Sequence, residues 1–258
     1  MEFFDSHSHF NDEKFKDDME EIIKLVYENN ITKTICVGYN LKQSEKALEI
    51  AEKNKFIYAT CGISPNDIED FCEDKLNKIE QLAKNSKVVA IGEIGLDYYW
   101  NKDNKNKQKE LFIKQIEIAN KLNKPISIHT REAVCDTLEI IKKYPVVQKG
   151  IFHCCPLNKE LIKEGLKLGY YISFSGNITF KNAKSEEAVS IVPNDRILIE
   201  TDSPYLSPEP FRGKRNDPRN VKLVAKKISE IKKISLEEIA KLTYENANRI
   251  YKLESLSE

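Results

Sequence analysis

The sequence lacks any long hydrophobic run. No apolar stretch approaches the roughly 20 residues that a transmembrane helix needs, and the N-terminus lacks the basic segment followed by an apolar one that marks a signal peptide. An excess of charge of one sign is also missing, because 41 Lys and Arg residues balance 41 Asp and Glu residues. We therefore expect a cytoplasmic protein with no membrane partner. Its overall field should attract neither nucleic acid nor anionic lipid, so any anion site must be a local patch.

Metal-binding cysteine pairs are absent too. The six cysteines show no CxxC spacing, and in a chain of 258 residues we expect reduced, mostly buried thiols instead of a disulfide framework or a thiolate zinc site. Histidine is scarce, with four in the whole chain. Two of them, His7 and His9, stand one residue apart in the run FDSHSHF, which makes this run the first candidate for a functional site.

Short apolar runs alternate with helical patterns along the chain. Eight runs rich in Ile and Val are typical of strands covered on both faces, and they lie near 1–5, 34–38, 56–60, 87–95, 125–129, 149–153, 170–175 and 196–201. Each is followed by a helical pattern, and the closing helices are predicted near 217–231 and 236–252. Eight such units in about 250 residues predict an α/β fold, a (β/α)8 TIM barrel, as a single domain over residues 1–258. No GxGxxG or Walker-type loop follows the first strand, which disfavours an open nucleotide-binding sheet. The oligomeric state stays open, a monomer included.

Polar side chains gather where these strands end, which is where such a barrel carries its chemistry. His7 and His9 follow the first strand and share a face, because alternate residues of an extended chain point the same way. All four histidines and two acidic residues occupy strand ends: His7, His9, Glu93, His129, His153 and Asp202. One histidine in such a place is most often a core residue. Six polar groups on one rim, however, leave carboxylates in a partly dry site that requires cations.

The types of these side chains restrict the metal. Imidazole and carboxylate together suit Zn, Mn, Fe or Co, and the lack of thiolate ligands argues against a closed structural zinc site. Six candidate ligands exceed the four of a tetrahedral site. A pair of divalent ions about 3.5–4 Å apart, bridged by a carboxylate, uses them more naturally. In that arrangement His7 and His9 bind one ion, with Asp5 steering them from behind.

These motifs together resemble the TatD family of metal-dependent deoxyribonucleases, a branch of the amidohydrolase-like barrels. The stretches DSHSH, GEIGLDY, IHTRE, SFSGNITFKNA, ETDSPYL and PFRGKRNDP stand in family order along nearly the whole chain. The resemblance implies two divalent metal ions and hydrolysis of DNA phosphodiester bonds as a 3′-5′ exonuclease. The ligand types accept Mg, Mn or Zn, and the zero net charge favours action on single-stranded DNA or frayed ends over a long duplex track. The resemblance also implies that the six residues above are the metal ligands. Glu93 would bridge the ions, and Asp202 would orient or deprotonate the attacking water.

The chain departs from the family pattern in two loops. The family usually has GxHPH after the third strand, where this chain has GISPND with Ser64 and Asn66 in the histidine positions. The family usually has HCFSG after the sixth strand, where this chain has HCCPL. Neither change removes a candidate ligand, so we expect hydrolysis to persist with an altered rate or substrate preference.

Contacts to substrate phosphates are expected from side chains near the same rim: Arg131, Asn177, Lys181, Arg212, Lys214 and Arg215. The RGKR run (212–215) follows the Asp202 strand closely, and the planar guanidinium group of Arg suits phosphate. Most basic runs, however, are solvated loops. Tyr98, Tyr99 and Trp100 follow the Glu93 strand. They either stack on a nucleobase or pack the loop.

Two other functions stay open from the sequence. One is an amidohydrolase-type enzyme acting on a small-molecule amide, lactone or phosphoester, because fold and metals do not fix the substrate. Many such enzymes bridge their ions with a modified lysine, where this chain has Glu93. The other is a non-catalytic metal- and DNA-binding protein, which the changes at Ser64, Asn66, Cys155 and Pro156 suggest.

Overall fold

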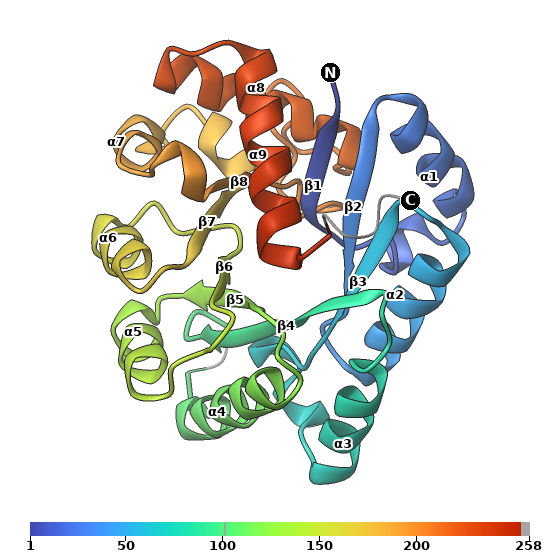
Figure 1. The fold of residues 1–258 in the computed structure, drawn as a ribbon, viewed down its shortest axis with the longest axis vertical. Coiled ribbons are helices and arrows are strands. Elements are labelled where there is room, and N and C mark those ends of the chain that lie inside the picture. The colour runs from blue at the N-terminus through green and yellow to red at the C-terminus, as the bar shows by residue number, and fades with distance from the viewer. Residues whose placement is uncertain (101, 254–258) are drawn as a thin grey trace.

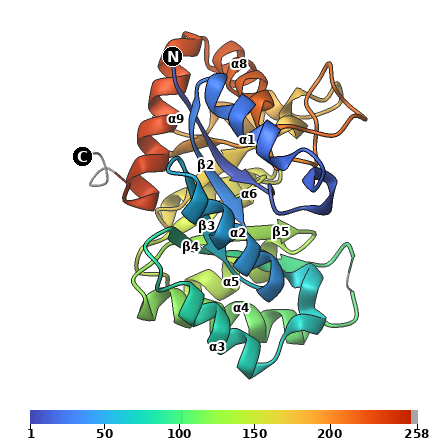
Figure 2. The ribbon, with the colours of Figure 1, turned by 90° about the vertical axis from the view of Figure 1, so that its right-hand side faces the viewer.

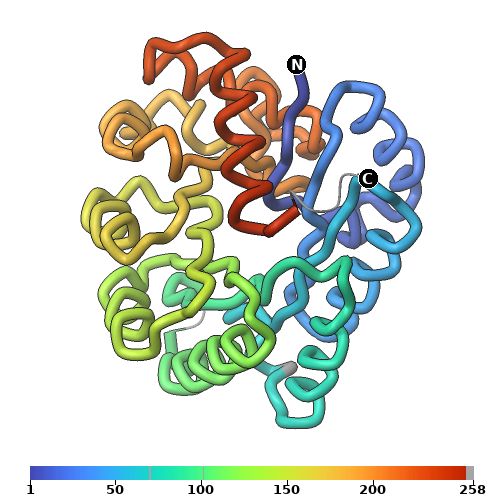
Figure 3. The backbone as a smooth tube through the Cα atoms, viewed as in Figure 1, coloured from blue at the N-terminus to red at the C-terminus, as the bar shows by residue number. Residues whose placement is uncertain are grey.

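The computed structural model describes residues 1–100 and 102–253, with the backbone alone at Asp70. These residues form a sheet of eight parallel strands in sequence order (Figures 1 and 3). The strands are β1 (Phe3–Ser8), β2 (Ile31–Val37), β3 (Ile57–Cys61), β4 (Val88–Asp97), β5 (Ile126–Arg131), β6 (Gly150–Phe152), β7 (Tyr171–Phe174) and β8 (Ile197–Ile199). The predicted (β/α)8 barrel is confirmed, with strand bounds that differ by a few residues from those expected.

The helices lie around the strands as an outer ring, except the last one, which crosses one end of the barrel (Figure 1). They are α1 (Met19–Glu28), α2 (Leu41–Lys53), α3 (Glu73–Leu82), α4 (Lys105–Lys121), α5 (Val134–Lys143), α6 (Lys159–Lys167), α7 (Ser185–Ser190), α8 (Val221–Lys232) and α9 (Leu236–Tyr251). A short 3-10 turn at 218–220 replaces the first turn of the helix predicted near 217–231, and another, at 65–70, precedes α3. Among the described residues, no helix is long and apolar enough to cross a membrane.

The first and last strands meet at the carboxyl end of the barrel. The Asp202 amide donates to the His7 carbonyl at 2.9 Å, and the His9 amide donates to the Ser203 carbonyl at 2.8 Å. The buried Asp5 carboxylate reinforces this seam, because it accepts hydrogen bonds from the Thr201 amide at 2.9 Å and the Thr201 hydroxyl at 2.5 Å. The seam therefore places the His7–His9 segment directly beside the Asp202 segment.

The opposite, amino-terminal end of the barrel is covered by α9. Its residues Ala247, Ile250 and Tyr251 join one apolar cluster with side chains of seven strands, all but β5, and the Tyr251 hydroxyl donates to the Ser6 carbonyl at 3.0 Å. The end of α9 accordingly lies near the middle of the ring in Figure 1 and along one side of the molecule in Figure 2. A second, larger cluster fills the space between the sheet and the outer helices. With this end closed, access to the interior comes from the carboxyl ends of the strands.

Two glutamines of α4 hold the loops that follow β3 and β4. Gln115 accepts from the Ile63 amide at 2.7 Å and donates to the Ile63 carbonyl at 2.9 Å. Gln108 does the same for Asp97, at 2.9 and 3.0 Å. Both glutamines are fully buried and lie seven residues apart, on one face of the helix. These buried backbone groups therefore have partners although they lie beyond the regular sheet ladder.

The six cysteines are unpaired, as expected. The expectation that most are buried holds for Cys36, Cys61 and Cys155, whereas Cys154 is partly exposed and Cys72 and Cys135 are exposed. Neither exposed thiol lies in a strand, because Cys72 precedes α3 and Cys135 is in the first turn of α5.

We predict that Gln115→Met lowers the free energy of unfolding by about 2–4 kcal/mol, because it leaves a buried amide and a buried carbonyl of Ile63 without partners. The matched control is Gln81→Met on the exposed face of α3, which should change stability by about 0.5 kcal/mol or less. Urea unfolding of both variants measures the difference. Equal stability of the two would contradict the role assigned to Gln115.

Candidate metal centre

The six candidate ligands converge at the carboxyl ends of the strands. On one side, the Nε2 atoms of His7 and His9 lie 3.2 Å apart. The Asp202 Oδ1 atom is 3.7 Å from the first of these nitrogens and 3.3 Å from the second. The Glu93 Oε2 atom is 3.6 and 3.9 Å from the same two nitrogens. Two imidazoles and two carboxylates thus face one point.

The other carboxylate oxygen of Glu93 faces a second pair of imidazoles. Its Oε1 atom lies 3.0 Å from His129 Nδ1 and 3.4 Å from His153 Nε2. These two nitrogens are 3.3 Å apart. Glu93 is therefore shared by two donor sets, one oxygen to each, in the way a bridging ligand is shared.

The local backbone explains how Glu93 reaches this position. It stands in GEIG near the end of β4, and its amide donates to the Gly38 carbonyl at 2.8 Å. Gly95 has φ +137°, and a Cβ atom there would collide with the His129 carbonyl. A glycine at 95 thus lets β4 approach β5 closely enough to bring Glu93 beside His129.

The donor chemistry of the cluster fits divalent cations. Imidazole nitrogens and carboxylate oxygens are ligands for Zn, Mn, Fe and Co. Each donor set directs several lone pairs at one small region, and a cation satisfies such an arrangement better than a few shared protons. The thiols stay outside both sets. His7 and His9 with Glu93, and Glu93 with His129 and His153, form compact groups whose ligand atoms lie within 4.8 Å of one another.

Burial and mutual charge set the protonation of these groups. Burial alone pushes the pKa of Glu93 upward, but the surrounding imidazoles, His153 first, hold it well below 4.5. Burial lowers the pKa of His7. For His153, burial also acts downward, but Glu93 and Glu200 outweigh it and raise the pKa well above 6.5. Without metal, the cluster therefore favours an ionised Glu93 beside a protonated His153.

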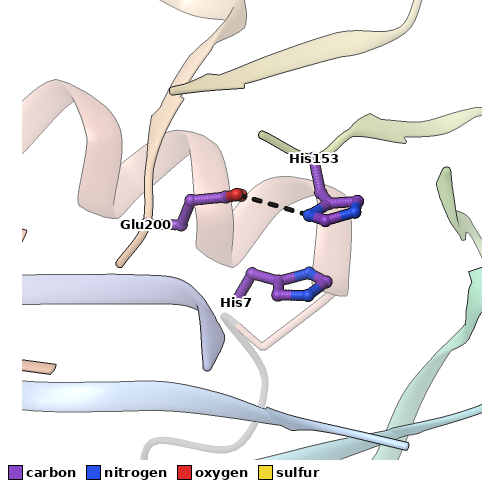
Figure 4. A group of neighbouring side chains, drawn as sticks. All are labelled: His7, His153 and Glu200. Carbon is purple, nitrogen blue, oxygen red and sulfur yellow. Dashed lines mark ion pairs between the residues drawn. The ribbon is translucent and has the colours of Figure 1, made fainter. Parts of the chain in front are cut away.

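Glu200 belongs to this site although the sequence analysis missed it. It is fully buried, and its Oε1 atom lies 3.4 Å from His153 Nδ1 (Figure 4). The other ring nitrogen, Nε2, is the one that faces Glu93. The same oxygen accepts the Cys154 amide at 2.6 Å. The rings of His7 and His153 lie face to face, with centroids 3.9 Å apart (Figure 4). Glu200 thus stands behind the ligands and orients His153, as carboxylates behind metal-bound imidazoles do.

Asp97 orients the His129 ring in the same way. Its Oδ2 atom lies 2.9 Å from His129 Nε2, opposite the nitrogen that faces Glu93. Burial alone raises the pKa of Asp97, but the contact with His129 leaves it lowered. Asp5, by contrast, holds the backbone of the barrel seam and contacts the amide of His7, at 3.3 Å. Asp5 was expected to steer the rings of His7 and His9, but its contact with this segment is to the backbone amide of His7.

Five of the six candidate ligands, all but His7, line a cavity of about 860 Å³ that opens to solvent. Of the six predicted phosphate contacts, Arg131 and Asn177 line this cavity. Lys181, Arg212 and Lys214 are exposed and are not among its lining residues. Arg215 also lies outside, where its guanidinium pairs with Asp18 at 2.5 Å. A phosphate role stays a prediction for all six.

Residues of both unusual loops line the cavity. The Ser64 hydroxyl accepts the Asn66 amide at 3.1 Å and begins a 3-10 turn. The Asn66 side chain donates to Asp97 Oδ2 at 3.4 Å. In the other loop Cys154 and Pro156 face the cavity, and Cys155 is buried. Asn66 therefore reaches the ligands indirectly, through the carboxylate that holds His129.

The comparisons with known proteins agree with this geometry. A family model described as TatD related DNase matches residues 4–252. The chain belongs to the TatD family. A relative from Bacillus subtilis (strain 168), the uncharacterized metal-dependent hydrolase YabD, is 45% identical over 252 residues, which are 97% of this chain and 99% of that protein. The uncharacterized metal-dependent hydrolase YcfH from Escherichia coli (strain K12) is 35% identical over 260 residues, 99% of this chain and 97% of that protein.

Solved structures show the same TatD fold. The crystal structure of YJJV, a TatD homologue from Escherichia coli K12, superimposes with a TM-score of 0.93 at 25% identity, covering 97% of this chain and 98% of that one. An organophosphorus hydrolase from Deinococcus radiodurans, at 12% identity and a TM-score of 0.66, shares the barrel fold alone. This TatD-family protein is accordingly a metal-dependent hydrolase, and its His and Glu clusters suit metal binding.

We predict that Glu200→Gln weakens metal binding about 10- to 100-fold, because the neutral amide no longer fixes and polarises His153. Titration of metal-free protein with Mn²⁺ or Zn²⁺ measures the affinity, and a thermal scan checks the fold. Glu187→Gln, an exposed change on α7, is the control and should leave the affinity unaltered. An unchanged affinity in Glu200→Gln would contradict the orienting role.

The cluster also predicts a pH dependence of metal binding. Burial lowers the pKa values of His9, His129 and His153, but nearby carboxylates raise all three above 6.5. In the metal-free protein, the ion pairs of these three protonated histidines stabilise the fold fully below pH 6.5, the ordinary pKa of histidine. This stabilisation is lost as the pH rises through their raised pKa values. Metal binding must displace these protons, so the metal-induced rise in Tm should be larger near pH 8 than near pH 6. Calorimetry at both pH values, with chelator as the blank, measures it; an equal rise would contradict the assignment.

Proposed function

We propose that the protein hydrolyses phosphodiester bonds of DNA, as a 3′-5′ exonuclease acting on single strands or frayed ends. The single observation that carries this proposal is Glu93, whose two oxygens face separate donor sets on the floor of an open cavity. That arrangement suits two divalent ions, Mg, Mn or Zn, close enough to act on one phosphoryl group. The match to the TatD related DNase model supports DNA as the substrate class.

Each donor set would hold one ion. His7, His9 and Asp202 would bind the first, His129 and His153 would bind the second, and Glu93 would bridge them. When bound, two such ions would lower the pKa of a shared water to about 7 and stabilise the charge that develops on the phosphoryl oxygens. The barrel interior supplies the dry and rigid setting in which such electrostatic stabilisation is effective.

Asp202 is the proposed proton acceptor. Its side chain is 14% exposed, lines the cavity and lies beside His9. Burial raises the pKa of Asp202, but the hydrogen bond to His9 and the nearby imidazoles leave it lowered, so the carboxylate is ionised at neutral pH and able to accept a proton. In the proposed step a water oxygen bonds to phosphorus, its proton passes to Asp202, and the bond from phosphorus to the leaving sugar oxygen breaks.

Substrate binding is proposed to be local. Arg131 and Asn177 lie at the cavity wall, where a guanidinium and an amide can bind phosphate oxygens. Lys181, Arg212 and Lys214 are available to more distant phosphates. A net charge of zero leaves the molecule without the broad positive track that long duplex contacts need, which supports action at strand ends.

The experiment that tests this function is a time course on end-labelled single-stranded and duplex DNA after each ion is restored to metal-free protein. Stepwise shortening from the 3′ end is expected. A small lactone and a dihydropyrimidine, assayed in parallel, test the amidohydrolase alternative. Turnover of either small molecule without DNA cleavage would overturn the proposal. Bound metal with no turnover of any phosphodiester would favour the non-catalytic alternative.

We predict that Asp202→Asn lowers the cleavage rate by about 10²–10⁴-fold, because it removes the proton acceptor and retains an oxygen donor in the same place. Elemental analysis at saturating ion should find metal content close to that of the wild type. Asp195→Asn, on an exposed 3-10 turn before β8, is the matched control. Cleavage at the wild-type rate in Asp202→Asn would exclude Asp202 as the acceptor.

A further inference from the structure

Three consecutive aromatic residues at the end of β4 have different surroundings. Tyr98 is 7% exposed, and its hydroxyl donates to Asp136 at 2.6 Å, so this residue packs the loop. Tyr99 is 44% exposed and Trp100 is 65% exposed. Trp100 also lines the cavity above the metal centre. An indole used to pack a loop would be largely buried, so its exposure here at the wall of a functional cavity needs another reason.

Arg131 completes a surface with these two rings, which we call the Trp100 platform (Tyr99, Trp100 and Arg131). The guanidinium carbon of Arg131 lies 3.9 Å from the centroid of the Tyr99 ring and 5.5 Å from that of Trp100. Within the described part of the chain, the Arg131 side chain forms no hydrogen bond or ion pair. Its N–H groups are therefore available to an acceptor that enters the cavity.

The platform is fixed to the metal centre through Asp97. The Oδ1 atom of Asp97 accepts the amides of Tyr99 and Trp100 at 2.9 and 3.0 Å. Its Oδ2 atom lies 2.9 Å from the candidate ligand His129. Arg131 stands opposite Asp97 in the register of β4 and β5, and its carbonyl accepts the Tyr98 amide at 2.9 Å. The buried carboxylate of Asp97 thus positions both the His129 ring and the backbone of Tyr99 and Trp100. The platform and the candidate metal centre are therefore held in a fixed relative position.

We propose that the Trp100 platform binds an unpaired nucleobase of the strand whose phosphodiester bond lies over Glu93. The base stacks on the indole of Trp100, and Arg131 binds the adjoining phosphate. This inference rests on the proposed nuclease function. It identifies a nucleobase as the part of the substrate that binds to this wall of the cavity.

The chemistry of the platform favours a nucleobase over other ligands. A flat aromatic face beside a guanidinium matches a flat base joined to an anionic phosphate. An acidic peptide would use Arg131 but has no general need of an exposed indole. Inside a duplex the bases are already stacked on one another, so the platform selects single strands or frayed ends. Stacking also tolerates every base, which fits an enzyme that shortens strands of any sequence.

The chain carries its own probe, because Trp100 is its one tryptophan. The intrinsic fluorescence of the full-length Asp202→Asn protein, loaded with Mn²⁺, therefore reports on the platform directly. A short thymidine oligonucleotide should quench this emission in a saturable way. A strand of the same length made of abasic residues presents the same phosphates without bases. It should bind about tenfold more weakly and leave the emission nearly unchanged.

Kinetics on otherwise wild-type protein separates stacking from loop packing. Trp100→Ala should raise KM for single-stranded DNA about tenfold with kcat changed less than about twofold, because stacking acts on ground state and transition state alike. Trp100→Phe retains an aromatic face and should restore most of the affinity. Tyr27→Ala, an exposed aromatic at the amino-terminal side of β2, is the matched control and should match the wild type.

The outcomes separate this inference from the proposed function. DNA cleavage by the wild type, together with an unchanged Trp100 emission and an unchanged KM in Trp100→Ala, would overturn the platform alone. Base-dependent quenching without cleavage by the metal-loaded wild type would support the platform and overturn the nuclease. Equal quenching by the thymidine and abasic strands would show that Trp100 senses phosphate binding instead of stacking, and would overturn the inference. Absence of both binding and cleavage would overturn both proposals.

Discussion

The structure depends on one desolvated carboxylate, Glu93, placed among four imidazoles. A buried carboxylate costs several kcal/mol of solvation free energy unless cations or donors surround it. Here each of its oxygens faces its own pair of histidines, at distances from 3.0 to 3.9 Å. The barrel meets this requirement because its strands close into a ring and β4 approaches β5, which brings the four imidazoles to one carboxylate.

A further layer of buried residues holds the candidate ligands. Asp97 holds His129, Glu200 holds His153, and Asp5 fixes the backbone between His7 and Thr201. Gln108 in turn holds the backbone of Asp97 from α4. Each of these groups is buried and anchored to a regular element. The imidazoles are thereby oriented before any ion arrives, which reduces the reorganisation that binding requires.

Much of this arrangement was predictable from the sequence, for a physical reason. The alternation of apolar runs and helical patterns follows from burial on both faces of a parallel strand, and it indicated the barrel. The position of each histidine at a strand end followed from the same pattern. Glu200 was missed although the signal was present: it lies two residues before Asp202, in the spacing that linked His7 to His9. Its direction, however, depends on how the ends of β6 and β8, which flank β7, face each other in the barrel, and no local pattern encodes this.

Contacts between distant loops were the least predictable part. The RGKR run suggested phosphate binding by Arg215, but the loop after β8 returns to the loop after β1, where Arg215 pairs with Asp18. Tyr98, Tyr99 and Trp100 were equivalent in sequence, and only the position of Asp136 and Arg131 separates the packing residue from the exposed ones. Such pairings depend on the tertiary path of the chain, which periodicity does not specify.

The most direct test of the shared role of Glu93 is anomalous diffraction from crystals of the protein grown with Mn²⁺. Two manganese peaks are expected about 3.5–4 Å apart, one on each side of the Glu93 carboxylate. The first should lie against His7 and His9 and the second against His129 and His153. A single peak, or peaks away from Glu93, would contradict the shared-carboxylate centre.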